Sequence, residues 1–205
     1  DVEDPLQAID IALEQGGYIM WNHPGWPDDK STFYPIHEEL IKAGKIDAYE
    51  VYNYMESYPL TFDWYEKYGI APVANTDIHG TVAGDYPCED GEFRPMTLIF
   101  AKEKSETGIR EALDARRTLA FFHGTLVGDK EYLTKRVGAC LNTRPLGEDK
   151  IQVTNVSDIS YRMSDGKYLY IFPAGKTVII SKPATELTVL NCLYGHKKPL
   201  KYSFQ

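Results

Sequence analysis

The sequence predicts an α/β protein built in two parts. Up to about residue 122, segments with helical periodicity alternate with short apolar runs, which is the pattern of parallel βαβ units. From about residue 150, short β-rich segments are separated by turn signals such as Asp165-Gly166, and helical periodicity is absent. That second pattern is typical of a small antiparallel β-sandwich. We therefore expect a first domain over residues 1–125, a connecting helix or linker over 126–149, and an all-β sandwich over 150–205.

Each element has a local signal. The first helix is expected to begin after Asp4, a suitable N-cap, with Pro5 at the first helical position, and to end at Gly16-Gly17. Ser105 is expected to cap another helix. That helix is predicted over residues 105–117. Three further helices are predicted over residues 35–44, 60–69 and 129–141. Buried strands are predicted over residues 18–22, 46–53, 70–76, 94–101 and 118–122.

The charge of the chain limits its partners. Lys and Arg number 22 against 30 Asp and Glu, which gives a net charge of −8. Sequence-independent nucleic-acid binding needs a basic surface, so we do not expect it. A phosphate-bearing substrate is still compatible with this charge if bound metal ions supply positive charge locally.

Targeting and redox signals are few. No apolar run approaches the ~20 residues of a membrane span, and no signal-like segment is present. The sequence starts at Asp1 without a methionine, so we expect that an upstream segment was removed, and a cytoplasmic, periplasmic or secreted location all stay open. Cys88, Cys140 and Cys192 lack metal-site spacing and are predicted to be free, packed thiols.

Polar residues recur at the carboxyl ends of the predicted strands. His23 follows the strand over 18–22, Glu50 and Asn53 end the next strand, and Asp77 and His79 follow the strand over 70–76. In a barrel-like α/β fold these ends converge on one face. Two imidazoles and a carboxylate suit zinc, manganese or iron. We therefore predict a divalent-metal site formed by His23, Asp77 and His79.

Other interpretations of these residues stay open. Asn-His-Pro-Gly and Asp-x-His-Gly are also ordinary turn sequences. Glu50 could ligate the metal ion, or could simply end a strand while it accepts a hydrogen bond from a neighbouring backbone N–H. Arg94 could hold a phosphate bidentately, or pair with the acids Glu89, Asp90 and Glu92. The sequence lacks the motifs of serine hydrolases, P-loop NTPases and zincins.

Four segments resemble a known family. GYIMWNHPGW, IDAYEVYN, NTDIHG and RPMTLIFAKEKSETGIREALDARRTLAFF are similar, in order and spacing, to the later part of a PHP domain. PHP (polymerase and histidinol phosphatase) domains are metal-dependent phosphoesterases. The resemblance covers about residues 1–125 and implies the carboxyl-terminal part of a distorted (β/α)7 barrel. It implies up to three divalent metal ions, with His23, Asp77 and His79 as ligands and Asp77 as the catalytic residue. It also implies hydrolysis of a small-molecule phosphate ester by a metal-activated water.

The sequence departs from the family at its beginning. The PHP barrel starts with an H-x-H motif after its first strand, and that motif is absent from this sequence. The resemblance therefore implies a missing amino-terminal part of the same protein as a partner, and a chain that is inactive alone. Arg94, Asn53 and Glu50 are candidate substrate contacts. The alternatives are a non-catalytic PHP-like binding or scaffold protein and an amidohydrolase-like metal hydrolase. For the latter, no lysine or further histidine is evident at a middle strand end.

Overall fold

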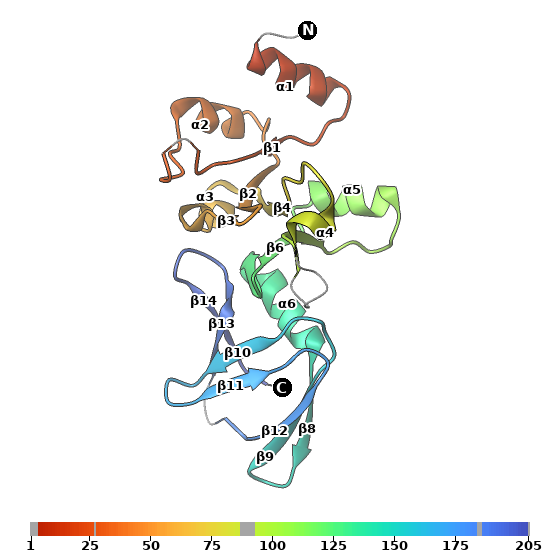
Figure 1. Ribbon diagram of the computed structural model, residues 1–205, viewed down its shortest axis with the longest axis vertical. Helices are drawn as coiled ribbons and strands as arrows, with labels where there is room; N and C mark the ends of the chain where they lie inside the picture. Colours follow the sequence, from red (N-terminus) through yellow and green to blue (C-terminus); the bar gives the residue numbers. More distant parts are fainter. Residues whose placement is uncertain (1–3, 27, 87–92, 184–185, 205) are drawn as a thin grey trace. The chain divides into compact units, whose positions relative to one another are not determined.

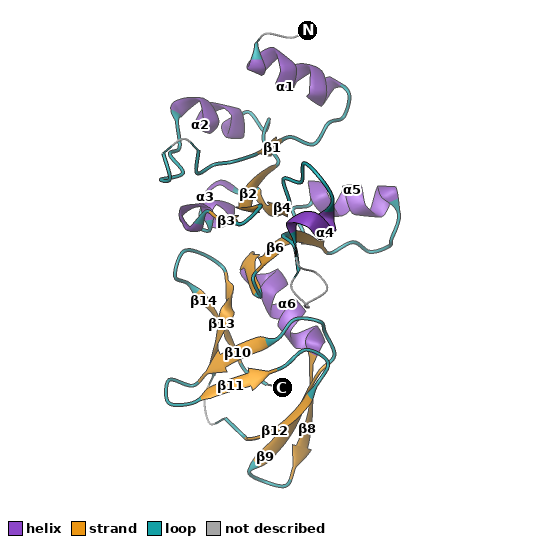
Figure 2. Cartoon of the chain, in the orientation of Figure 1, coloured by secondary structure: helices purple, strands orange, loops and turns teal. Residues whose placement is uncertain are grey.

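The computed structural model describes residues 4–26, 28–86, 93–183 and 186–204. The chain divides into two compact units, residues 1–123 and 124–205. The first unit mixes helices and strands, whereas the second is mainly strands with one helix, α6 (Lys130–Cys140) (Figures 1 and 2). The expected three-part division, with a linker over residues 126–149, stays a prediction.

The elements of the first unit follow one another in short alternation. Its helices are α1 (Pro5–Glu14), α2 (Pro35–Lys42), the 3-10 turn η1 (Pro59–Thr61), α3 (Trp64–Tyr68), α4 (Val82–Asp85) and α5 (Glu106–Asp114). Its strands are β1 (Met20–Trp21), β2 (Ala48–Asn53), β3 (Glu56–Ser57), β4 (Ala71–Asn75), β5 (Met96–Ile99) and β6 (Thr118–Phe122).

The predicted helix starts are confirmed at two caps. The Asp4 side chain accepts a hydrogen bond from the Leu6 backbone N–H over 2.9 Å, and the Ser105 hydroxyl accepts one from Gly108 over 3.0 Å. Both side chains thus satisfy an amide that has no partner inside the helix. The helix predicted over 60–69 is instead split into η1 and α3.

A small parallel sheet forms the centre of the first unit. β2 pairs in parallel with β1 on one side and with β4 on the other, and the short β3 pairs antiparallel with β2. All six residues of β2 are buried, as expected for a strand covered on both faces. Ala48 on β2 and Ala71 and Val73 on β4 form a core cluster against which Tyr18 packs.

The predicted fold was the carboxyl-terminal part of a (β/α)7 barrel followed by an all-β sandwich, and this prediction is wrong. β5 and β6 pair antiparallel with each other and do not extend the parallel sheet of β4. Side-chain hydroxyls link them to β4: Thr97 bonds the N–H and C=O of Ala74 over 2.9 and 3.1 Å, and Thr118 donates to the Pro72 carbonyl over 2.8 Å. Pro72 has no backbone N–H on the side of β4 that faces Thr118. A regular ladder of backbone hydrogen bonds along that side would therefore lack a donor at Pro72.

The second unit also differs from an antiparallel all-β sandwich. Its strands are β7 (Thr125–Gly128), β8 (Leu141–Leu146), β9 (Lys150–Asn155), β10 (Tyr161–Ser164), β11 (Leu169–Phe172), β12 (Thr177–Ser181), β13 (Leu187–Leu193) and β14 (Pro199–Tyr202). One sheet has the order β11-β10-β13-β7, with β14 also on β13, and the other is β12-β9-β8. β13 pairs in parallel with β7, and α6 belongs to this unit. The observed class is mixed α/β.

The interior of the second unit holds two of the three cysteines. Cys140 and Cys192 are free and buried, as predicted, whereas Cys88 lies outside the described residues. Burial raises the pKa of the Cys192 thiol to about 12, so this thiol stays protonated at neutral pH. It is therefore an unreactive packing residue.

Candidate functional site

The carboxyl ends of the three parallel strands carry an unusual backbone conformation. His23 follows β1, Tyr54 follows β2 and Asp77 follows β4, with φ values of 50°, 51° and 48°. Non-glycine residues rarely adopt this left-handed region, and such residues cluster at functional sites. Because β1, β2 and β4 are neighbours in register, the three residues occupy one edge of the sheet.

These strand ends open into one pocket. A pocket of about 300 Å³ is lined by His23, Trp26, Asn53, Tyr54, Glu56 and Asp77. Three residues selected from the sequence, His23, Asn53 and Asp77, are thus brought together although they are up to 54 positions apart in the sequence. The lining includes two carboxylates and no Lys or Arg.

Glu50 lies behind this pocket as a buried hydrogen-bond acceptor. Only 1% of it is exposed. Its Oε1 accepts from the side-chain amides of Asn53 and Asn75 over 2.9 and 2.8 Å. Its Oε2 accepts from the His23 backbone N–H over 2.6 Å and lies 3.6 Å from His23 Nδ1. A buried carboxylate needs several donors of this kind to offset the loss of its hydration. Glu50 is therefore placed to orient His23 and Asn53.

The other selected residues lie outside the pocket lining. His79 Nδ1 is 2.8 Å from the backbone carbonyl of Asp77, and both residues are exposed. That contact folds the His79 ring back onto the turn that carries Asp77. Arg94 is exposed, and the acids proposed as its alternative partners lie outside the described residues.

No complete metal centre is formed by the described residues alone. Within them, no group of three or more His, Cys, Asp or Glu side chains is arranged to hold a metal ion. His23 and Asp77, an imidazole and a carboxylate, nevertheless have the donor chemistry of a zinc, manganese or iron site and share one pocket. These two residues therefore fit part of the ligand set of such a metal ion.

Several residues at or beside the pocket were not selected from the sequence, among them Glu56, Tyr58 and Asn75. Tyr58 donates from its hydroxyl to Glu56 Oε2 over 2.9 Å. Its pKa is raised, first by burial, then by this hydrogen bond and by the nearby charges of Glu56, Glu50 and Asp77, so it is a neutral donor at physiological pH. Asn75 ends β4 as Asn53 ends β2, so the strand-end rule could have found it. Tyr58 lies in a loop and gives no comparable signal.

The two tryptophans near the strand ends have different surroundings. Trp21 is enclosed, with ring centroids 4.7 Å from Trp64 and 3.7 Å from His37. Burial lowers the pKa of His37, so this histidine is an uncharged packing partner at neutral pH. Trp26, in contrast, lines the pocket with 73% of its surface exposed. An aromatic side chain at that position offers a flat contact surface beside the pocket.

The described helices include none that is both long and apolar enough to cross a membrane.

Comparison with known proteins gives one informative similarity. No protein-family model and no curated protein matches the sequence. Among solved structures, the chain is similar to a two-domain protein from Bacteroides vulgatus ATCC 8482 described as containing a predicted PHP-like metal-dependent phosphoesterase. The TM-score is 0.92 at 29% sequence identity, over 100% of this chain and 66% of that protein. The chain thus spans slightly less than two thirds of the length of the protein it resembles.

Proposed function

We propose that this chain is part of a PHP-type metal-dependent phosphoesterase, in which the pocket at the ends of β1, β2 and β4 is part of the active site. The observation that carries the proposal is the convergence of His23, Asn53 and Asp77 on one pocket, whose lining also includes all three left-handed strand-end residues, His23, Tyr54 and Asp77. The similarity to the Bacteroides vulgatus protein supports it at the level of reaction class.

In this proposal the chain supplies only some of the metal ligands. His23 and Asp77 would bind a divalent metal ion from the pocket, and His79 would join them if its ring turned away from the Asp77 carbonyl. We propose that the remaining ligands come from a further part of the same protein. The greater length of the Bacteroides vulgatus protein is compatible with this arrangement.

The charge of the pocket favours a metal-dependent rather than a metal-free site. Its lining carries Glu56 and Asp77, and neither Lys nor Arg is among the lining residues described. A phosphate ester would be repelled by these carboxylates unless cations lay between them. When bound, the metal ion supplies the positive charge that binds the ester and activates the attacking water.

The residues of the chain have distinct tasks in this site. Glu50 fixes the His23 backbone, and it holds the Asn53 amide through the other carboxylate oxygen. Asn53, with 5% of its surface exposed, lines the pocket, where its side-chain amide would contact the substrate. Arg94 remains a candidate phosphate contact, which would require that the exposed side chain reach the substrate.

Replacing Asp77 tests the proposal. In the full-length protein, Asp77→Ala is expected to reduce metal-dependent hydrolysis of p-nitrophenyl phosphate to the level measured with a chelator. Asp149→Ala, an exposed acid of the second unit, serves as the matched control and should leave turnover unchanged. Unchanged turnover of Asp77→Ala would exclude the assignment. Assays on phosphate esters and cyclic amides side by side separate this reaction from that of an amidohydrolase.

A further inference from the structure

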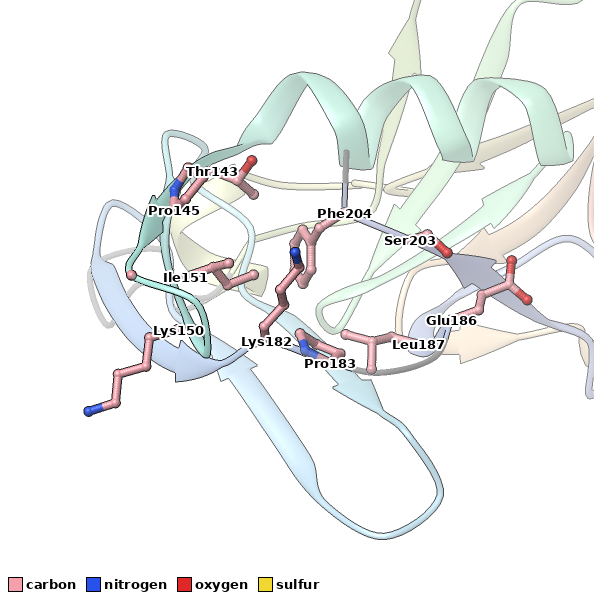
Figure 3. A pocket seen from close by; sticks show the side chains of 11 residues that line it. Thr143, Pro145, Lys150, Ile151, Lys182, Pro183, Glu186, Leu187, Ser203 and Phe204 are labelled. Carbon is pink, nitrogen blue, oxygen red and sulfur yellow. The ribbon is translucent and has the colours of Figure 1, made fainter.

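The second unit contains a pocket of its own, unrelated to the strand ends of the first unit. It has a volume of about 390 Å³, within the range of small-molecule sites. Its lining comes from five segments: β8 with the following turn, β9, the residues after β12, the start of β13 and the residues after β14 (Figure 3). A ligand there would contact both sheets of the unit.

The floor of this pocket is apolar and fixed. Ile151 and Leu187 line it with only 6% and 1% of their surfaces exposed. Phe204 adds an aromatic ring, which is held edge-on by Phe172 and by Tyr202, each with its ring centroid 5.7 Å away. Because these side chains are packed from behind, the apolar surface is preformed and a ligand would not have to order it.

The pocket also carries the exposed ammonium group of a lysine. Lys182 lines it, and no salt bridge to Lys182 is found within the described part of the chain. Figure 3 labels both lysines of the lining, and in this view the Lys182 side chain projects across the middle of the lining side chains, whereas Lys150 extends outward. Glu186 also lines the pocket, and among the ion pairs of the described residues none joins it to Lys150 or Lys182. This ammonium group is therefore not neutralised by an ion pair within the described residues, although the chain as a whole has a net charge of −8.

We propose that this pocket binds a small amphipathic carboxylate, with its apolar body against Phe204 and Pro183, above the buried floor of Ile151 and Leu187, and with its carboxylate at Lys182. One ammonium group matches one negative charge, so a monoanion fits better than a phosphate or a dicarboxylate. The aromatic ring of Phe204 and the adjoining Pro183 favour an aryl body over a flexible chain, because stacked rings bury area with little loss of conformational freedom.

Three probes of one shape test the charge requirement. The full 205-residue chain is titrated with 3-phenylpropionate, 3-phenylpropan-1-ol and 3-phenylpropylamine while ¹H–¹⁵N amide shifts are followed. The acid is expected to bind saturably in about the millimolar range, with shifts centred on Ile151, Lys182 and Leu187. The alcohol should bind several-fold more weakly and the amine should produce no saturable shifts. Equal binding of all three probes, or saturable binding of none, would overturn the proposal.

Charge variants locate the anion. Lys182→Gln should weaken 3-phenylpropionate binding about three- to fivefold at low salt, the size expected for an exposed ion pair. This difference should shrink as salt is added. Lys150→Gln is the matched control and should change the affinity less than about twofold, whereas Glu186→Gln should raise it slightly, because removing one like charge reduces repulsion. If Lys150→Gln weakens binding as much as Lys182→Gln does, the anion is attracted by general surface charge and the proposed site is wrong.

Discussion

The buried carboxylate of Glu50 ties the ends of two parallel strands together by binding the backbone of His23. Glu50 Oε2 accepts the His23 N–H over 2.6 Å, across 27 residues of sequence. The same oxygen lies 3.6 Å from His23 Nδ1. A left-handed residue at a strand end needs surrounding structure to hold it there, and this hydrogen bond provides part of that support. The orientation of the His23 ring at the pocket therefore depends on a residue that does not line it.

Replacing Glu50 with Gln should destabilise the first unit. Both carboxylate oxygens accept hydrogen bonds from donors, so the amide group of Gln would place a second donor against at least one of them. The expected loss is about 1–3 kcal/mol in the free energy of unfolding, measured by urea denaturation at pH 7. Glu39→Gln, on the exposed surface of α2, is the control and should stay within about 0.5 kcal/mol of the parent. Equal stabilities of the two variants would contradict the role assigned to Glu50.

The same substitution should also weaken metal binding. This expectation rests on the proposed metal site: groups that orient a metal-bound histidine typically contribute about 10- to 100-fold to metal affinity. We expect Glu50→Gln to lower the zinc affinity of the full-length protein about tenfold, measured by calorimetry at pH 7, and His23→Ala to lower it further. His196→Ala, in the second unit, is the control. A folded Glu50→Gln protein with parental zinc affinity would show that Glu50 serves only the fold.

The accuracy of the sequence predictions depends on how local each signal is. The helix starts at Asp4 and Ser105 follow from side chains that bond amides two and three residues away, and both predictions are confirmed. Whether β5 and β6 run parallel or antiparallel depends on which strands they pair with. A run of hydrophobic residues does not indicate the pairing partner of a strand. Pro72 was the one local clue, because it removes an N–H from the side of β4 that faces Thr118.

The candidate site shows the same division. Polar residues at strand ends could be placed together from the sequence alone, because adjacent parallel strands end at one edge, and His23, Asn53 and Asp77 do line one pocket. The role of each residue within the site could not be deduced in this way. The burial of Glu50 and its bond to Asn75 join positions 25 residues apart, and only the folded chain reveals them. The metal ligation of His23, Asp77 and His79 stays a prediction.

Gly25 is required by the close approach of an aromatic ring. A Cβ atom at this position would lie 2.5 Å from Cδ1 and 2.6 Å from Cε1 of Tyr58. Gly25→Ala should therefore displace the Tyr58 ring and cost about 1–3 kcal/mol of stability, measured by urea denaturation. Gly80→Ala is the matched control, because a Cβ there would meet nothing within 4 Å. If Gly25→Ala proved as stable as Gly80→Ala, the ring contact would be too loose to constrain the pocket.

Two tyrosines with buried hydroxyl groups, the partly buried Tyr18 and the fully buried Tyr49, should respond in opposite ways to the loss of those groups. The Tyr18 hydroxyl is buried without a hydrogen-bond partner in the described structure, whereas the Tyr49 hydroxyl accepts a hydrogen bond from the Tyr65 backbone N–H over 3.2 Å. Tyr18→Phe removes a polar atom that gains nothing from burial, so it should leave stability unchanged or raise it by up to about 1 kcal/mol. Tyr49→Phe removes an acceptor and should cost about 0.5–1.5 kcal/mol.

The pH dependence of stability distinguishes the two variants further. Burial, reinforced by the charge of Asp47, raises the pKa of Tyr18 from 10.0 to about 12. The unfolded chain therefore releases this proton first, so the stability is fully present below pH 10 and is lost as the pH rises through 10 to 12. Tyr18→Phe lacks this ionisation and should lose stability less steeply in that window, as followed by urea denaturation at successive pH values.

Burial also raises the pKa of Tyr49, so Tyr49→Phe should likewise show a shallower alkaline loss, but from a lower starting stability. If Tyr18→Phe declined as steeply as the parent, the Tyr18 hydroxyl would be hydrated and the packing against Ala48 and Val73 would be looser than described.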